Sequence, residues 1–285
     1  MVAAGAPRRR SVLAAAAALG LAACGKEPPV ADQDAGLDGD EVGTAYGDDP
    51  SQFGQLLLPD GEPRGVVVVV HGGFWKAEYD LSLGTPLAQD LTARGWVTWN
   101  LEYRRVGSGP GGGGGVPATL DDVAAGIDHL ATMAAAGLVP AAALDRVVTL
   151  GHSAGGHLAT WAAGRPDPVV PVTDVVSQAG VLDLVAASRA GLGGGAVDAF
   201  LGHAPGPADA AADPAQQLPL AVPVHCVHAP DDDIVPISQS REYVERATAA
   251  GATADLTEVT GGHFGVIEVG SPAWQRILEI IGGIG

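Results

Sequence analysis

From about residue 46 onward, short apolar runs alternate with segments of helical periodicity, and this alternation constrains the fold more than any other feature. The expected strands are 55–58, 66–70, 96–101, 147–150, 172–176, 222–227 and 254–259. The expected helices are 81–94, 120–136, 155–163, 237–250 and 273–281. Strands that alternate with helices predict an α/β fold with a mostly parallel central sheet and helices on both faces. Ligands of such folds bind at the carboxyl ends of the strands.

Residues 1–23 have the layout of a bacterial export signal. Three arginines at 8–10 precede an apolar run that is shorter than the roughly 20 residues a membrane-spanning helix needs. The run leads to Leu21-Ala22-Ala23-Cys24, which resembles a lipobox, the motif whose cysteine receives lipid and becomes the new N-terminus. Arg9-Arg10 and the residues after them resemble, more loosely, a twin-arginine signal. We therefore expect an exported protein, lipid-anchored through Cys24 to the outer face of the bacterial cell membrane.

The remaining chain is expected to form a tether and one catalytic domain. Residues 24–45 carry acidic residues among Gly, Ala and Pro with no apolar periodicity, which is typical of a flexible tether. Residues 46–285 are the expected domain, and the Ala-, Gly- and Pro-rich segment at about 185–220 lies between two expected strands, where a small lid would be inserted. The formal net charge of −18 disfavours binding to the phosphates of nucleic acids.

Gly151-His152-Ser153-Ala154-Gly155 matches the G-x-S-x-G nucleophile elbow and lies between an expected strand and an expected helix. The turn is so tight that side chains two residues before or after the serine would collide with the strand and the helix, so glycine is needed there. The helix N-terminus also offers free N–H groups and a positive dipole. The pattern predicts Ser153 as a nucleophile and the Ala154 N–H as an oxyanion donor.

A serine hydroxyl needs a base, and the base needs an acid that orients it. His263 lies between the last expected strand and the last expected helix, so it is the predicted base. The acid is expected among the aspartates at 231–233, with Asp183 as the other candidate. Three adjacent carboxylates also suggest a metal site, but adjacent side chains point in different directions, and we expect none.

His71-Gly72-Gly73-Phe74-Trp75 directly follows the expected strand 66–70. Glycines after a buried strand leave backbone N–H groups accessible to a developing oxyanion. The segment therefore predicts the rest of the oxyanion hole.

These motifs together resemble the α/β-hydrolase superfamily over residues 46–285, and above all its esterase and arylformamidase-like members. The segments that carry the resemblance are HGGFW at 71–75, NLEYRR at 100–105, GHSAGGHLA at 151–159 and DDIVP at 232–236. The resemblance implies Asp232 as the acid, through the pattern H-G-x-x-D-x-x-V-P, and backbone donors near Gly73 and Phe74. The chain departs from the family at Ala229, where glycine is usual, and at Val116, where an aromatic residue usually follows the glycine run.

The function expected from these residues is hydrolysis of a small-molecule carboxylic ester through an acyl-enzyme, with neither a metal nor an organic cofactor. One alternative is an amidase of the arylformamidase type, although export argues against it because N-formylkynurenine is usually made inside cells. Another is a catalytically silent binding module on the cell surface. Such relatives typically lose a member of the triad, whereas Ser153, Asp232 and His263 are all present here.

Overall fold

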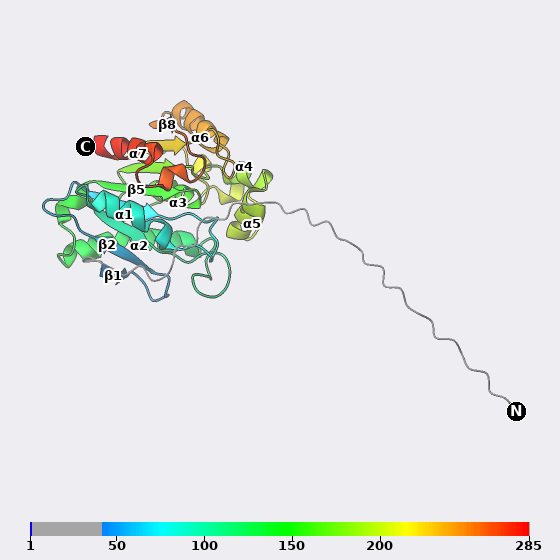
Figure 1. Ribbon diagram of the computed structural model, residues 1–285, viewed down its shortest axis with the longest axis horizontal. Helices are drawn as coiled ribbons and strands as arrows, with labels where there is room; N and C mark the ends of the chain where they lie inside the picture. The colour runs from blue at the N-terminus through cyan, green and yellow to red at the C-terminus, as the bar shows by residue number, and fades with distance from the viewer. Residues whose placement is uncertain (2–41, 285) are drawn as a thin grey trace. The chain divides into compact units, whose positions relative to one another are not determined.

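The computed structural model describes Met1 and residues 42–284 (Figure 1). The chain divides into two units, Met1–Leu37 and Asp38–Gly285, and every described residue except Met1 belongs to the second unit. The expected signal beyond Met1, the lipidation residue Cys24 and the tether up to residue 41 lie outside the described residues.

An eight-stranded sheet in the order β1-β2-β4-β3-β5-β6-β7-β8 forms the centre of the domain. The pairs β1–β2 and β2–β4 are antiparallel and the other pairs are parallel, which confirms the predicted mostly parallel sheet. The strands are β1 Val42–Ala45, β2 Phe53–Leu57, β3 Val66–Val70, β4 Val97–Leu101, β5 Val147–His152, β6 Asp174–Gln178, β7 Val224–His228 and β8 Ala254–Glu258.

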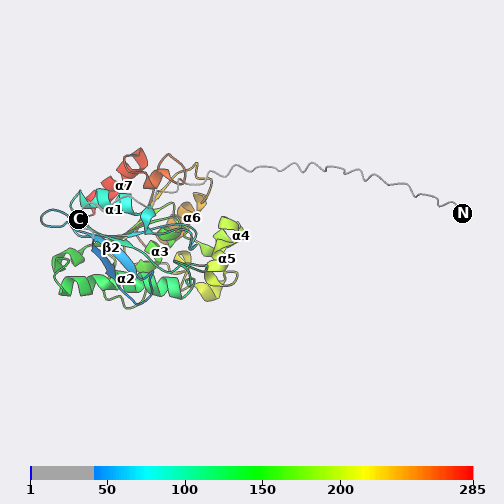
Figure 2. The same ribbon diagram turned by 60° about the horizontal axis from the view of Figure 1, so that its bottom comes forward.

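Helices cover both faces of this sheet, as Figure 2 shows for α1 and α7 on one side and α2 on the other. Successive side chains of a strand point to opposite faces, so the five valines of β3 supply both cores. Val67 and Val69 pack with α1 and α7, whereas Val66, Val68 and Val70 pack with α2, α3 and α6. The long helices are α1 Thr85–Thr92, α2 Ala118–Ala135, α3 Ala154–Ala163, α6 Ser238–Ala249 and α7 Pro272–Gly283.

Two expectations about element bounds need correction. Residues 42–45, assigned above to the tether, form β1 and pair with β2, so the sheet begins before the expected domain boundary. The helix expected over 81–94 is instead a short 3₁₀ turn at Leu81–Leu83 followed by α1. The break has a local cause, because Gly84 lies between the two and Pro86 suits only the first turn of a helix.

The expected lid is the segment between β6 and β7, which contains α4 Leu184–Arg189 and α5 Ala196–Leu201 (Figure 1). Two side chains of α3 hold it in place. His157 Nε2 donates to the Ala212 carbonyl at 2.8 Å, and Trp161 Nε1 donates to the Ala211 carbonyl at 2.8 Å. Within residues 42–284, none of the helices has the length and apolar character needed to cross a bilayer.

Candidate active site

Ser153 occupies a sharp turn between β5 and α3, at the carboxyl end of the sheet. Its backbone has φ 55° and ψ −117°, a strained conformation for a residue with a side chain. A Cβ added to Gly151 would collide with the Gly155 carbonyl, and one added to Gly155 would collide with the carbonyl of Val70 on β3. The turn therefore requires both glycines, as predicted for a nucleophile elbow.

His263 follows β8, and its Nδ1 lies 2.7 Å from Asp232 Oδ2 in the turn after β7. Burial alone would raise the pKa of the Asp232 carboxyl, but hydrogen bonds from His228 and His263 hold that pKa well below its usual range. Asp232 is therefore ionised and can only accept, so Nδ1 of His263 carries a hydrogen. The Nε2 of His263 is left with a free lone pair, which is the form a general base needs.

The other candidate acid has a different role. Asp183 is the N-cap of α4, where one of its oxygens accepts from the Ala186 N–H at 2.7 Å. Its other oxygen accepts from Arg246 Nη1 at 2.8 Å. The structure thus pairs His263 with Asp232, and Asp183 caps a lid helix.

His152 connects the serine turn to His263. Its ring centroid lies 4.5 Å from that of His263, and its Nε2 donates to the His263 carbonyl at 2.9 Å. Burial lowers the pKa of His152 to about 3, so the ring is neutral. No hydrogen bond joins Ser153 Oγ to His263 within residues 42–284, and in free enzymes this contact often forms only when substrate binds.

The loop after β3 passes directly beside the serine. A Cβ added to Gly72 would lie 3.2 Å from Ser153 Cβ. Gly73, Phe74 and Trp75 have φ values of 109°, 53° and 55°, so the backbone takes three consecutive residues through positive φ. The N–H groups of Gly73 and Phe74 donate to no protein acceptor in the described part of the chain.

The third candidate donor is the N–H of Ala154. Ala154 is the first residue of α3, so its N–H has no partner within the helix. None of the three N–H groups predicted for the oxyanion hole therefore has an acceptor among residues 42–284.

Residues 100–105 contact the loop after β3 and hold it in position. The Tyr103 hydroxyl donates to the His71 carbonyl at 2.7 Å, and the rings of Tyr103 and His71 stack with centroids 4.4 Å apart. Glu102 is buried, forms an ion pair with Arg105 and accepts from the Leu81 N–H at 2.9 Å. From the sequence this motif was only a family signature. The structure shows that it binds the backbone of His71 and Leu81.

A cavity of about 450 Å³ adjoins Phe74, on the lid side of the loop. Three segments far apart in the sequence line it, namely the loop after β3, residues 106–110 at the start of the glycine-rich loop that ends at Gly115, and α5. Lys76 Nζ donates to the carbonyl of Gly193, in the turn before α5, at 3.3 Å, which joins the loop after β3 to the lid. The lining residues are Phe74, Lys76, Ala77, Glu78, Val106, Gly107, Ser108, Pro110, Ala196 and Ala199.

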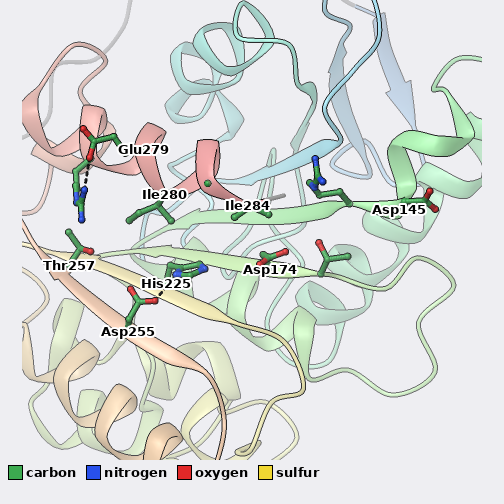
Figure 3. A pocket seen from close by; sticks show the side chains of 12 residues that line it. Asp145, Asp174, His225, Asp255, Thr257, Glu279, Ile280 and Ile284 are labelled. Atoms are coloured by element: carbon green, nitrogen blue, oxygen red, sulfur yellow. Dashed lines mark hydrogen bonds and ion pairs between the residues drawn. The ribbon is translucent and has the colours of Figure 1, made fainter.

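A second cavity, of about 720 Å³, lies at the opposite ends of the strands (Figure 3). Asp174 begins β6 and His225 is the second residue of β7, so these side chains are at the amino edge of the sheet. His225 Nδ1 lies 2.6 Å from Asp255 Oδ2, as the close-up shows. Because Ser153 is at the carboxyl ends of the strands, this cavity is not part of the candidate active site.

Several solved structures share this fold. A thermophilic esterase from Thermogutta terrifontis is 22% identical, with a TM-score of 0.67 over 85% of this chain and 90% of that one. A truncated carbohydrate esterase from gut microbiota is 19% identical, with a TM-score of 0.70 over 86% and 95%. An acetyl ester-xyloside bifunctional hydrolase from Caldicellulosiruptor lactoaceticus is 20% identical, with a TM-score of 0.66 over 86% and 97%. These likenesses confirm the α/β-hydrolase fold.

No protein of curated function matches the sequence significantly. A family model described as BD-FAE matches residues 56–246, from β2 into α6. The match includes Ser153 and Asp232 and ends before His263. Since it covers more than half of the chain, the protein belongs to the BD-FAE family.

Proposed function

We propose that this protein hydrolyses carboxylic esters through an acyl-enzyme formed on Ser153. The observation that carries the proposal is the hydrogen bond between His263 and an ionised Asp232. His152, which directly precedes the strained Ser153, donates a hydrogen bond to the main chain of His263 and so brings the serine turn to this pair. This arrangement holds the His263 imidazole with its Nδ1 hydrogen on Asp232, so that its Nε2 is available to act on a hydroxyl at a helix N-terminus. Nucleophilic acyl transfer needs both groups.

In the acylation step, Ser153 Oγ attacks the ester carbonyl carbon while His263 Nε2 takes the hydroxyl proton. The carbonyl oxygen becomes an oxyanion and accepts hydrogen bonds from the N–H groups of Gly73, Phe74 and Ala154. The bond to the alcohol oxygen then breaks, and His263 returns the proton to the departing alcohol. Asp232 stays ionised throughout and stabilises the imidazolium.

Deacylation repeats these roles with water as the nucleophile. His263 takes a proton from the water, whose oxygen attacks the acyl carbon and again forms an oxyanion in the same site. The bond between the acyl carbon and Ser153 Oγ breaks, and His263 returns the proton to the serine. The products are a carboxylic acid and an alcohol, and the reaction as written uses only groups of this chain and water.

The structural neighbours suggest which substrates to try first. The Thermogutta terrifontis esterase has been solved with butyrate and with propionate bound, and phosphonylated by sarin. Two other neighbours are a carbohydrate esterase and an acetyl ester-xyloside hydrolase. We propose short acyl groups for this chain too, with acetyl esters of carbohydrates among the candidate substrates.

The test compares the wild-type protein with Ser153→Ala on p-nitrophenyl acetate, butyrate and octanoate, and on N-formylkynurenine. We expect ester turnover and labelling by a fluorophosphonate probe in the wild type, and the loss of both in the variant. Ester turnover that persists in Ser153→Ala would contradict the serine mechanism. Preference for the formamide would favour the amidase, and a folded wild type with neither turnover nor label would favour the binding module.

A further inference from the structure

Asp232 accepts four hydrogen bonds, and one of them comes from a histidine that the mechanism above does not use. Its Oδ1 accepts from the N–H groups of Ile234 at 2.9 Å and Val235 at 2.8 Å. Its Oδ2 contacts His263 Nδ1 at 2.7 Å and His228 Nε2 at 3.1 Å. The side chains of Asp232 and His228 are completely buried, so bulk solvent does not reach these contacts.

The surroundings of His228 fix where its hydrogen lies. Its Nε2 faces two acceptors, Asp232 Oδ2 and the Val235 carbonyl at 2.9 Å, so this nitrogen must carry a hydrogen. Its Nδ1 lies 2.8 Å from the hydroxyl of Ser240, which can donate to it. A neutral His228 with its hydrogen on Nε2 therefore satisfies every contact that the ring makes.

We propose that His228 is a positioning residue of the active site, which donates its Nε2 hydrogen to the same Asp232 oxygen that binds His263. The inference rests on the proposed serine hydrolase function, in which His263 is the base. His228 acts on His263 only through Asp232, since within residues 42–284 the two histidines share no hydrogen bond.

A shared oxygen has two consequences. Two donors fix the direction of the Oδ2 lone pairs and so fix the plane of the His263 ring. The His228 N–H also takes part of the negative charge of Asp232, so Asp232 attracts the His263 imidazolium less strongly than an unshared carboxylate would. His263 then returns its proton to the leaving group more readily. Without His228, the carboxylate of Asp232 would hold the His263 imidazolium more tightly. His263 would then become protonated, and the activity lost, at a higher pH.

Other titratable groups near Asp232 and His263 do not hide the effect of His228 on the proton of His263. His152 packs against His263 from the end of β5, but it is neutral because burial lowers its pKa to about 3. Asp231 and Asp233 flank Asp232 on the same turn and are exposed, so solvent screens their charges. His228 is thus the buried polar side chain whose removal changes the hydrogen bonding of Asp232 without removing a triad member.

The experiment measures the acid limb of kcat/KM for p-nitrophenyl acetate with the full chain, in wild type, His228→Asn and His228→Gln. The asparagine amide stays beside Ser240 and does not reach Asp232, whereas the glutamine amide places an N–H near the position of the histidine Nε2. We expect the midpoint of the acid limb to rise by about half a pH unit to one unit in His228→Asn, and to stay at the wild-type value in His228→Gln. Ser240→Ala is the matched control, because it removes a hydrogen bond of His228 that does not involve Asp232, and its midpoint should not move.

A second readout does not depend on turnover. The proton between His263 Nδ1 and Asp232 gives a downfield NMR signal, which should move in His228→Asn and return in His228→Gln. A folded His228→Asn protein with an unchanged midpoint and an unchanged signal would overturn the proposal. If His228→Asn does not fold, a midpoint shift of half a unit or more in His228→Gln overturns it instead. Activity that persists in Ser153→Ala would overturn the proposed function, and the NMR signal would still test His228.

Discussion

His152 shows how closely the serine turn and the proposed base, His263, are connected. It directly precedes the proposed nucleophile, Ser153, donates a hydrogen bond to the main chain of His263 and packs against its ring. Any displacement of the elbow therefore moves the base as well.

Gly73 allows a residue-scale test of the oxyanion hole. Its φ is 109°, and an added Cβ would collide with the ring of Tyr79, so Gly73→Ala must displace the loop that carries the donors. We expect kcat for p-nitrophenyl acetate to fall by roughly 10²–10³, the typical effect of losing one oxyanion donor. Steady-state kinetics would check this prediction.

Gly113→Ala is the control for that experiment. Gly113 also has a positive φ, 83°, but nothing lies within 4 Å of an added Cβ. It imposes similar backbone strain at a distance from the donors and should leave kcat within about twofold of wild type. Equal kcat values in the two variants would mean that Gly73 and Phe74 do not hold the oxyanion.

The candidate site could be predicted from sequence only where a motif has a fixed place in the fold. Ser153 and His263 each follow a strand, so chain order suggested that they meet at one edge of the sheet, whereas the family resemblance was needed to choose Asp232 among the candidate acids. His152 and His228 belong to strands and are buried, and their partners are distant in sequence or across a turn. A buried histidine in a strand is compatible with many roles, and only the positions of its neighbours distinguish between them.

At the scale of elements, one aromatic contact joins the lid to the loop after β3, in addition to the hydrogen bonds from Lys76 and α3. Phe200 of α5 stacks on Trp75 with ring centroids 4.7 Å apart, and it is 1% exposed. Removing a buried phenylalanine ring typically costs about 3–5 kcal/mol. We expect Phe200→Ala to lower the free energy of unfolding by about 3 kcal/mol, as measured by urea denaturation.

Phe200→Ala should also lower kcat. Its partner Trp75 directly follows Phe74, whose N–H is a proposed oxyanion donor. Phe200→Leu keeps an apolar side chain and serves as the milder control, with a smaller loss of stability and of kcat. A loss below about 1 kcal/mol in Phe200→Ala would show that the lid is not held by this ring.

The elements that sequence predicted best are those with a strong local pattern. The valine run of β3 has the predicted bounds, because five β-branched residues in a row strongly favour a buried strand. β1 was missed because Val-Gly-Thr-Ala has a weak pattern, and the strand exists through its pairing with β2, where Val42 is opposite Leu56. Pairing partners of this kind are tertiary information that a local pattern does not contain.

At the scale of the whole molecule, three buried histidines make stability depend on pH. Burial lowers the pKa of His71 and of His152 to about 3 and that of His157 to about 4. All three titrate near pH 6.5 when unfolded, so between about pH 4 and 6.5 the unfolded chain binds protons that the folded protein does not. The free energy of unfolding is thus retained above about pH 6.5 and falls as the pH drops towards 4.

We expect the unfolding free energy, measured by urea denaturation, to fall with pH as if at least three protons were taken up on unfolding near pH 5. Each proton corresponds to about 1.4 kcal/mol per pH unit. His157→Gln should lower the uptake by one proton. A free energy of unfolding that stays constant from about pH 6.5 to 4.5 would contradict the assignment of these rings as neutral.

The N-terminal motif leads to a prediction about where the whole protein resides. If Leu21-Ala22-Ala23-Cys24 is a lipobox, the protein expressed in a suitable bacterium should incorporate labelled fatty acid and sediment with membranes, and Cys24→Ser should do neither. Cys226→Ser is the matched control, because Cys226 is a buried free thiol in β7 and should not affect labelling. Labelled fatty acid in the Cys24→Ser protein would refute the lipid anchor.

The contact between Trp75 and Phe200 also matters to anyone who would redesign this protein. Lids are attractive segments to exchange between hydrolases, because they are inserted between two strands and leave the sheet untouched. Here an exchange would remove the aromatic surface against which the loop after β3 rests, together with the carbonyl that His157 binds. A transplanted lid would have to bring both features with it. A library that varies only the cavity side of α5 is the safer way to alter the proposed ester specificity.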